Sequence, residues 1–136
     1  MPLLHFHVLG GRTDDEIKAL LDAAHEAMLE AFSVPRRDRY QLVSEYKPSR
    51  FIVEDTGLDI PRTEKVVLVQ MFSRPRGEEK IALFYKLLTE RLEAECGIAS
   101  SDVMVSVVEN QDAHWSFGRG RAQFLTGELG AGKPVH

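Results

Sequence analysis

One proline at the start of this 136-residue sequence could do chemistry that no other residue type offers. Because the residue after Met1 is small, we expect Met1 to be removed, which leaves the Pro2 nitrogen as a secondary amine at the chain terminus. An α-amino group titrates near about pH 8, so its surroundings can hold it as a cation or as a free base. It could act as an acid, a base or a nucleophile. The structural alternative is a proline that only begins a strand, where its missing amide donor is tolerated.

Two arginines lie just before a predicted helix start, in the sequence Ser73-Arg74-Pro75-Arg76. The first turn of a helix attracts anions, and guanidinium groups bind carboxylates through paired hydrogen bonds. Arg74 and Arg76 could therefore hold the carboxylate of a small substrate. The alternative is an exposed ion pair with Glu78 or Glu79 in the first helical turn, which would contribute little.

A carboxylate, Asp38, follows a basic pair and precedes a predicted strand. It could serve as a turn residue or form a salt bridge with Arg36, Arg37 or Arg39. If it lies beside Pro2 instead, its charge favours the protonated amine, while neighbouring arginines oppose that cation.

Aromatic residues and glycines alternate near the end of the chain, in a segment too irregular for a core strand. Trp115, Phe117 and Phe124 could line a pocket or pack in a core or interface. The run 118–121, Gly-Arg-Gly-Arg, lacks the strand-to-helix context of a phosphate-binding loop.

Two histidines on one strand face, His5 and His7, could bind a metal ion, but no recognisable motif adds a third ligand, so we expect none. The one cysteine, Cys96, cannot form an internal disulfide and is expected to be a packing residue. The net charge of −4 argues against nucleic acid and anionic membranes as partners. Without a long apolar run, we expect a cytoplasmic protein.

Hydrophobic periodicity predicts the elements that must position these residues. Two helices are expected, one capped by Thr13 and Glu16 and ending near Ser33, the other closed by Gly97. Four strands are expected at Leu3–Val8, Tyr40–Tyr46, Lys65–Ser73 and Val103–Val108. The third strand is continuously apolar from Val66 to Val69, which predicts a central strand covered on both faces.

The order strand, helix, strand occurs twice, and an offset of 64 aligns Arg12 with Arg76 and Asp38 with Asp102. We therefore expect an α/β fold in which two β-α-β units form a four-stranded mixed sheet with two helices on one face. Residues 1–129 would form one domain, with halves at about 2–55 and 64–110, and 130–136 a flexible tail. The uncovered sheet face predicts an oligomer.

These features together resemble the tautomerase superfamily, whose members use an amino-terminal proline. The sequences VPRRDRYQ, SRPR and WSFGRGRAQFLTGEL resemble the malonate semialdehyde decarboxylase family more closely, and the resemblance extends from Pro2 to about Leu129. It implies a cofactor-independent homotrimer that acts on a small carboxylate. It assigns catalysis to Pro2, Asp38, Arg74 and Arg76. It assigns the substrate pocket to both arginines together with Trp115, Phe117, Phe124 and Leu129.

The implied reaction is decarboxylation of malonate semialdehyde to acetaldehyde and carbon dioxide, with hydratase activity as a possible addition. Pro2 could polarise the aldehyde as a cation or form a Schiff base. A hydratase, dehalogenase or tautomerase acting on a small unsaturated or halogenated acid is the first alternative. A trimeric binding protein without catalysis is the second.

Overall fold

The computed structural model describes residues 2–129, so Met1 and the predicted tail at 130–136 lie outside the described residues. Six main elements follow one another, with the short helix α3 (Gln123–Thr126) after them: β1 (Leu3–Leu9), α1 (Asp14–Phe32), β2 (Tyr40–Tyr46), β3 (Val67–Ser73), α2 (Glu78–Cys96) and β4 (Val103–Glu109). The predicted strands and long helices are confirmed, although β3 begins two residues later than expected.

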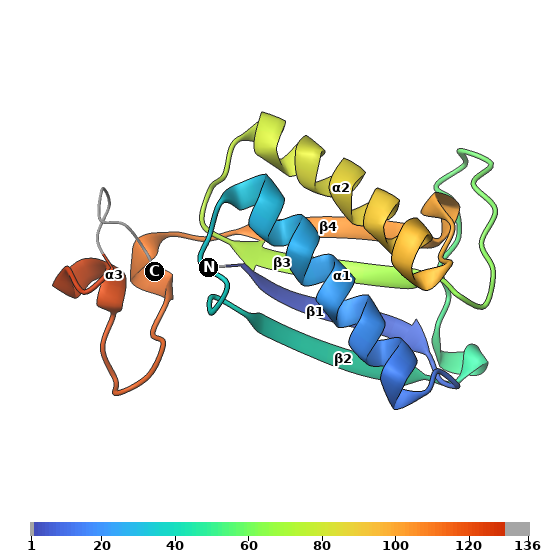
Figure 1. The fold of residues 1–136 in the computed structure, drawn as a ribbon, viewed down its shortest axis with the longest axis horizontal. Coiled ribbons are helices and arrows are strands. Elements are labelled where there is room, and N and C mark those ends of the chain that lie inside the picture. The colour runs from blue at the N-terminus through green and yellow to red at the C-terminus, as the bar shows by residue number, and fades with distance from the viewer. Residues whose placement is uncertain (1, 130–136) are drawn as a thin grey trace.

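The four strands form a mixed sheet in the order β2-β1-β3-β4. β1 runs parallel to β2 and antiparallel to β3, and β3 runs parallel to β4. Both long helices cover the same face of this sheet (Figure 1). This architecture confirms the predicted fold class. It also makes β3 an interior strand, as its apolar sequence predicts.

Local sequence signals explain where the helices begin and end. Thr13 and Glu16 form a complete capping box at the start of α1, and Ser33 ends that helix in a left-handed conformation. Gly97 ends α2 in the same conformation, with φ of 66°. Gly77 precedes α2 and supplies no side-chain cap. Of the helices that the structure describes, none has the length and apolar character needed to cross a membrane.

The core lies between the two long helices and the sheet face they cover. Phe6 on β1, Val69 on β3 and Phe84 on α2 are each 0% exposed. On the opposite sheet face, Leu68 is half-buried and Leu42 is 53% exposed. No described segment covers that second face (Figure 1), so the described chain provides the predicted cover of β3 on one face, and the second face is the one that the predicted oligomer would cover.

The two halves of the chain correspond closely. β1 begins at residue 3 and β3 at 67, while α1 begins at 14 and α2 at 78, a spacing of 64 in both cases. The amide of Asp38 donates to Pro35 at 2.9 Å, and the amide of Asp102 donates to Ala99 at 2.9 Å. Because β1 and β3 are antiparallel, equivalent positions of the two halves lie at opposite ends of the sheet.

Candidate active site

Strand register brings Pro2 close to the other ionisable candidates. Pro2 is buried and precedes Leu3, which pairs with Tyr40 on β2 and with Phe72 on β3. Extending both registers by one residue places Pro2 between Arg39 and Ser73, in strands about 5 Å apart. Asp38 and Arg74 are the next residues on either side. The start of β1 thus lies at the end of the sheet where β3 leads into α2 (Figure 1).

Arg76 is held at this end of the sheet with part of its guanidinium buried. Its Nε donates to Ser73 Oγ at 3.0 Å, and its Cζ lies 5.4 Å from the centre of the Phe32 ring. Its Nη2 is buried and has no protein acceptor among the described residues. Burial lowers the pKa of Arg76, and the positive charge of Arg74 adds to this effect, whereas Asp38 opposes it. Arg76 therefore lies within electrostatic reach of both predicted partners.

Arg74 has a different environment from its neighbour. Its Nη1 donates to Asp112 at 3.0 Å, and its Cζ lies 4.0 Å from the centre of the Phe124 ring. Its Nε is buried and has no acceptor in the part of the chain that the structure describes. The sequence suggested Glu78 or Glu79 as ion-pair partners, but the carboxylate that pairs with Arg74 comes from the segment after β4.

Asp38 lies at the buried end of a turn, with only 9% of its surface exposed. Its amide donates to the Pro35 carbonyl, so the predicted turn role is present. Two arginines considered as salt-bridge partners, Arg36 and Arg39, instead pair with carboxylates of α1. The charge of Asp38 acts on Arg76, whose pKa it raises, and this favours a role for Asp38 in the site.

The predicted aromatic residues form one cluster beside Arg74. Trp115 stacks on Phe117 with ring centres 5.6 Å apart, and Phe124 meets Phe117 edge-on at 5.5 Å. Tyr40, which the sequence did not single out, stacks on the same Phe117 ring at 5.9 Å. Leu129 is half-buried next to α3. The cluster forms an apolar wall through which Phe124 contacts a guanidinium.

Polar side chains fix the irregular segment that carries this wall. Trp115 Nε1 donates to Asn110 at 2.6 Å. Gln123 accepts from the Phe117 amide at 2.9 Å and donates to the Gly118 carbonyl at 2.8 Å. Neither Asn110 nor Gln123 carried a recognisable sequence signal, because single amides contribute nothing to a periodic pattern. The segment is thus ordered by side-chain hydrogen bonds where regular backbone pairing ends.

The first turn of α2 adds donors to the same region. Gly77 provides no side chain to accept from the first amides of α2, and Arg76 immediately precedes it. The amides at a helix start favour an anion, particularly when no side chain occupies them. This end of the sheet can therefore bind a carboxylate with both guanidinium and amide groups.

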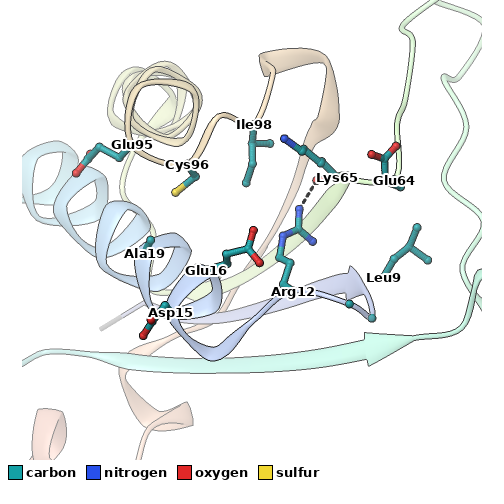
Figure 2. Close-up of a pocket in the computed structure, with 12 residues that line it drawn as sticks. Leu9, Arg12, Asp15, Glu16, Ala19, Glu64, Lys65, Glu95, Cys96 and Ile98 are labelled. Atoms are coloured by element: carbon teal, nitrogen blue, oxygen red, sulfur yellow. Dashed lines mark hydrogen bonds between the residues drawn. The ribbon is translucent and has the colours of Figure 1, made fainter.

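At the opposite end of the sheet, the equivalent helix start of the first half borders a cavity of about 480 Å³ lined by different charged groups. Figure 2 shows Arg12 donating to the Lys65 carbonyl, a bond of 2.7 Å, with Glu16 beside it. The Glu16 carboxylate accepts from the Thr13 amide, and this bond lowers the pKa of Glu16. Cys96 also lines the cavity, and burial raises the pKa of its thiol. An internal carboxylate therefore already occupies this helix start.

The histidines considered as metal ligands lie side by side on the uncovered sheet face, and each is hydrogen-bonded to neighbouring side chains. Their rings stack with centres 4.0 Å apart. His5 bonds to Ser44 at 2.6 Å, and His7 bonds to Tyr46 and Gln70 at 2.6 Å each. No group of three potential metal ligands occurs among residues 2–129.

Comparison with known proteins identifies the family of this chain. Two family models described as tautomerase enzyme match residues 2–59 and 38–118. The probable tautomerase YrdN of Bacillus subtilis (strain 168) is 55% identical over 129 residues, which are 95% of this chain and 100% of that protein. The probable tautomerase YusQ of the same organism is 30% identical over 126 residues, with 92% and 99% covered.

Solved structures show the same relationship. A malonate semialdehyde decarboxylase studied for its decarboxylase and hydratase activities is 59% identical, with a TM-score of 0.92 over 93% of this chain and 98% of that one. The FG41 malonate semialdehyde decarboxylase, inhibited by 3-bromopropiolate, is 38% identical, with a TM-score of 0.89 over 93% and 97%. A fused 4-OT trimer, 23% identical with a TM-score of 0.75 over 92% and 98%, shares the fold. The chain therefore belongs to the tautomerase family of enzymes, and within it resembles the malonate semialdehyde decarboxylases.

Proposed function

We propose that this protein decarboxylates malonate semialdehyde to acetaldehyde and carbon dioxide, with Pro2 as the catalytic amine and no cofactor. The observation that carries the proposal is the pair of guanidinium groups beside the register position of Pro2. Arg74 and Arg76 each keep one buried N–H without a protein acceptor among the described residues. Such donors suit an anionic substrate. The similarity to two malonate semialdehyde decarboxylases supports the choice of reaction.

The hydrogen bonds of the two arginines determine which edges remain for a carboxylate. Nε of Arg76 already donates to Ser73, so Arg76 offers the substrate its terminal edge, formed by Nη1 and Nη2. Nη1 of Arg74 already donates to Asp112, so Arg74 offers the substrate its lateral edge, formed by Nε and Nη2. Both edges have the paired N–H geometry that matches the two oxygens of a carboxylate. Together they would fix the scissile carbon–carbon bond relative to the aldehyde.

Pro2 would supply the electron sink in the same site. Its protonated amine would donate a hydrogen bond to the aldehyde oxygen as the carbon–carbon bond breaks. The bonding electrons of the carbon–carbon bond then form the enolate, carbon dioxide leaves, and the enolate carbon takes a proton from solvent water to give acetaldehyde. Asp38 would stabilise the amine cation by its charge. This is electrostatic stabilisation of a developing oxyanion, and a Schiff base on Pro2 is the covalent alternative.

The aromatic wall would favour loss of charge from the substrate. Trp115, Phe117, Phe124 and Leu129 would surround the carboxylate with apolar surface that solvates an anion poorly. Carbon dioxide is neutral and pays no such penalty, so the environment favours the product side of the bond cleavage.

We further propose that the active protein is a homotrimer in the cytoplasm. The uncovered sheet face, with Leu42 at 53% and Val108 at 47% exposed, is the surface that other copies would cover. The fused 4-OT relative, which shares the fold, is a trimer.

The test is acetaldehyde formation from malonate semialdehyde by the wild type and by Pro2→Ala, Arg74→Ala and Arg76→Ala. Pro2→Ala should reduce turnover by at least about 100-fold, the usual effect of removing a group that stabilises the transition state. Arg74→Ala and Arg76→Ala should reduce turnover to a similar extent, because the substrate carboxylate is no longer positioned relative to the aldehyde. Arg121→Ala, on an exposed residue of the aromatic segment, is the matched control and should retain activity. Full activity of Pro2→Ala would refute the proline mechanism.

A substrate panel separates the alternatives. Halide release, hydration or keto–enol exchange without carbon dioxide would instead identify a dehalogenase, hydratase or tautomerase. Ligand binding without any turnover would identify a binding protein.

A further inference from the structure

Asp112 lies immediately after β4 and contacts Arg74 directly. Its Oδ1 is 3.0 Å from Arg74 Nη1, and the side chains of Arg74 and Asp112 are 25% and 45% exposed. The sequence motifs do not include Asp112, and no step of the proposed reaction uses its charge. Its charge nevertheless acts on one of the two groups that would bind the substrate carboxylate.

The geometry of this ion pair fixes the rotation of the Arg74 guanidinium. Asp112 binds Nη1, which lies on the Cδ side of the group, away from the Nε N–H. Phe124 covers one face of the same group at 4.0 Å, so the plane is fixed as well. The lateral edge formed by Nε and Nη2 is consequently held in one direction. A substrate would meet a preorganised donor pair at this edge.

The charge of Asp112 has a second effect because the substrate carboxylate loses its charge during the reaction. Arg74 and Arg76 bind the anionic ground state more strongly than a transition state in which negative charge moves to the aldehyde oxygen. Binding that favours the ground state raises the barrier. Asp112 partly neutralises Arg74 and so weakens this unproductive part of carboxylate binding.

We propose that Asp112 is a positioning residue that orients Arg74 and limits how tightly the site binds the substrate carboxylate. This inference rests on the proposed decarboxylase function. It gives Asp112 a signature that a purely structural contact would not produce: removing its charge should strengthen carboxylate binding and slow turnover together.

Asp112→Asn is the decisive variant, because the amide keeps an oxygen that can accept from Arg74 while the charge is removed. Malonate is the binding probe, titrated into wild type and variant and followed by calorimetry. We expect malonate to bind the variant about three- to five-fold more tightly, the size expected for a partly exposed ion pair. With malonate semialdehyde, KM and kcat should both fall by a similar factor, as when ground-state destabilisation is removed.

Glu128→Gln is the matched control, since it removes the charge from an exposed ion pair with Arg121 on the same segment. It should change neither malonate affinity nor the kinetic constants. Circular dichroism at equal protein concentration verifies that both variants fold. Asp112→Ala, which also removes the acceptor, should lower kcat further through lost orientation of Arg74.

Unchanged or weaker malonate binding by a folded Asp112→Asn variant would overturn the proposal, as would a rise in KM with the fall in kcat. That second pattern would make Asp112 only a structural tether. A wild type that forms no acetaldehyde would refute the proposed function instead, and the malonate titration would still decide the effect of Asp112 on carboxylate binding.

Discussion

Replacing Arg76 by methionine should stabilise the protein while strongly reducing the proposed decarboxylase activity. The Arg76 guanidinium is partly buried, and its pKa is lowered first by burial and then by Arg74, with Asp38 opposing. A lowered pKa means that the cation is less favourable in the folded state than in the unfolded one. Both states are protonated at neutral pH, so the folded protein carries the whole of this penalty. Removing the charge should recover it.

The expected gain follows from the contacts of Arg76. Leaving a buried N–H such as Nη2 without an acceptor costs about 1–3 kcal/mol. Against this, Met loses a cation–π contact with Phe32 that contributes about 0.5–1 kcal/mol. The hydrogen bond to Ser73 is also lost, but Ser73 Oγ still donates to the Arg74 carbonyl at 2.8 Å. Because methionine can keep packing on Phe32, we expect a net gain of about 1 kcal/mol.

Urea denaturation followed by far-ultraviolet circular dichroism measures the free energy of unfolding, at one protein concentration because assembly contributes. Arg36→Met is the matched control. Its hydrogen bond with Glu26 raises the pKa of Arg36, so losing that exposed charge should not stabilise the protein. Decarboxylation by Arg76→Met should fall at least about 100-fold, since two charge-assisted bonds are lost. An Arg76→Met variant less stable than the wild type would show that Arg76 is structural, and the reasoning would be wrong.

Three further predictions concern the helices and the aromatic wall. Glu16→Gln should reduce the free energy of unfolding at neutral pH, because hydrogen bonding to Thr13 lowers the pKa of Glu16 in the folded protein. Urea titrations should show this difference from wild type disappearing as the pH falls from 4.5 through the folded-state pKa. Ser33→Gly should raise the free energy of unfolding by about 1 kcal/mol, since Ser33 has φ of 53°, whereas Gly97→Ser at the equivalent position should lower it by a similar amount. Phe124→Leu should weaken malonate binding several-fold in calorimetry by removing the ring that covers Arg74.

Most of the fold could be predicted because its signals are local. The alternation of Leu4, Phe6 and Val8 identifies the buried face of β1, and Thr13 with Glu16 marks the start of α1. The apolar run at Val66 misled the prediction only at the start of β3, since apolar character does not distinguish a paired residue from one just before the pairing begins.

The site was less accessible to sequence reasoning. Arg74 and Arg76 could be identified because only one residue separates them and both lie just before a helix start. Asp112 could not, because it lies 38 residues from Arg74 and only the fold brings them together. The sequence identifies Tyr40 only as the first residue of a strand. Its contact with Phe117 depends on how the irregular segment after β4 folds over the end of the sheet. Contacts between residues that are far apart in the sequence produce no periodic pattern from which they could be predicted.

Because Gly77 provides no side-chain cap, amide exchange at the start of α2 should show whether an anion is bound there. The amide hydrogens of Thr13 and Glu16 at the start of α1 are bonded to the Glu16 and Thr13 side chains, so their exchange with deuterated solvent should be slow and unaffected by added anions. Those at residues 78–80 have no such shield and should exchange quickly until an anion lies against them. Deuterium uptake at the start of α2 would thus measure ligand binding, with uptake at the start of α1 as the internal standard.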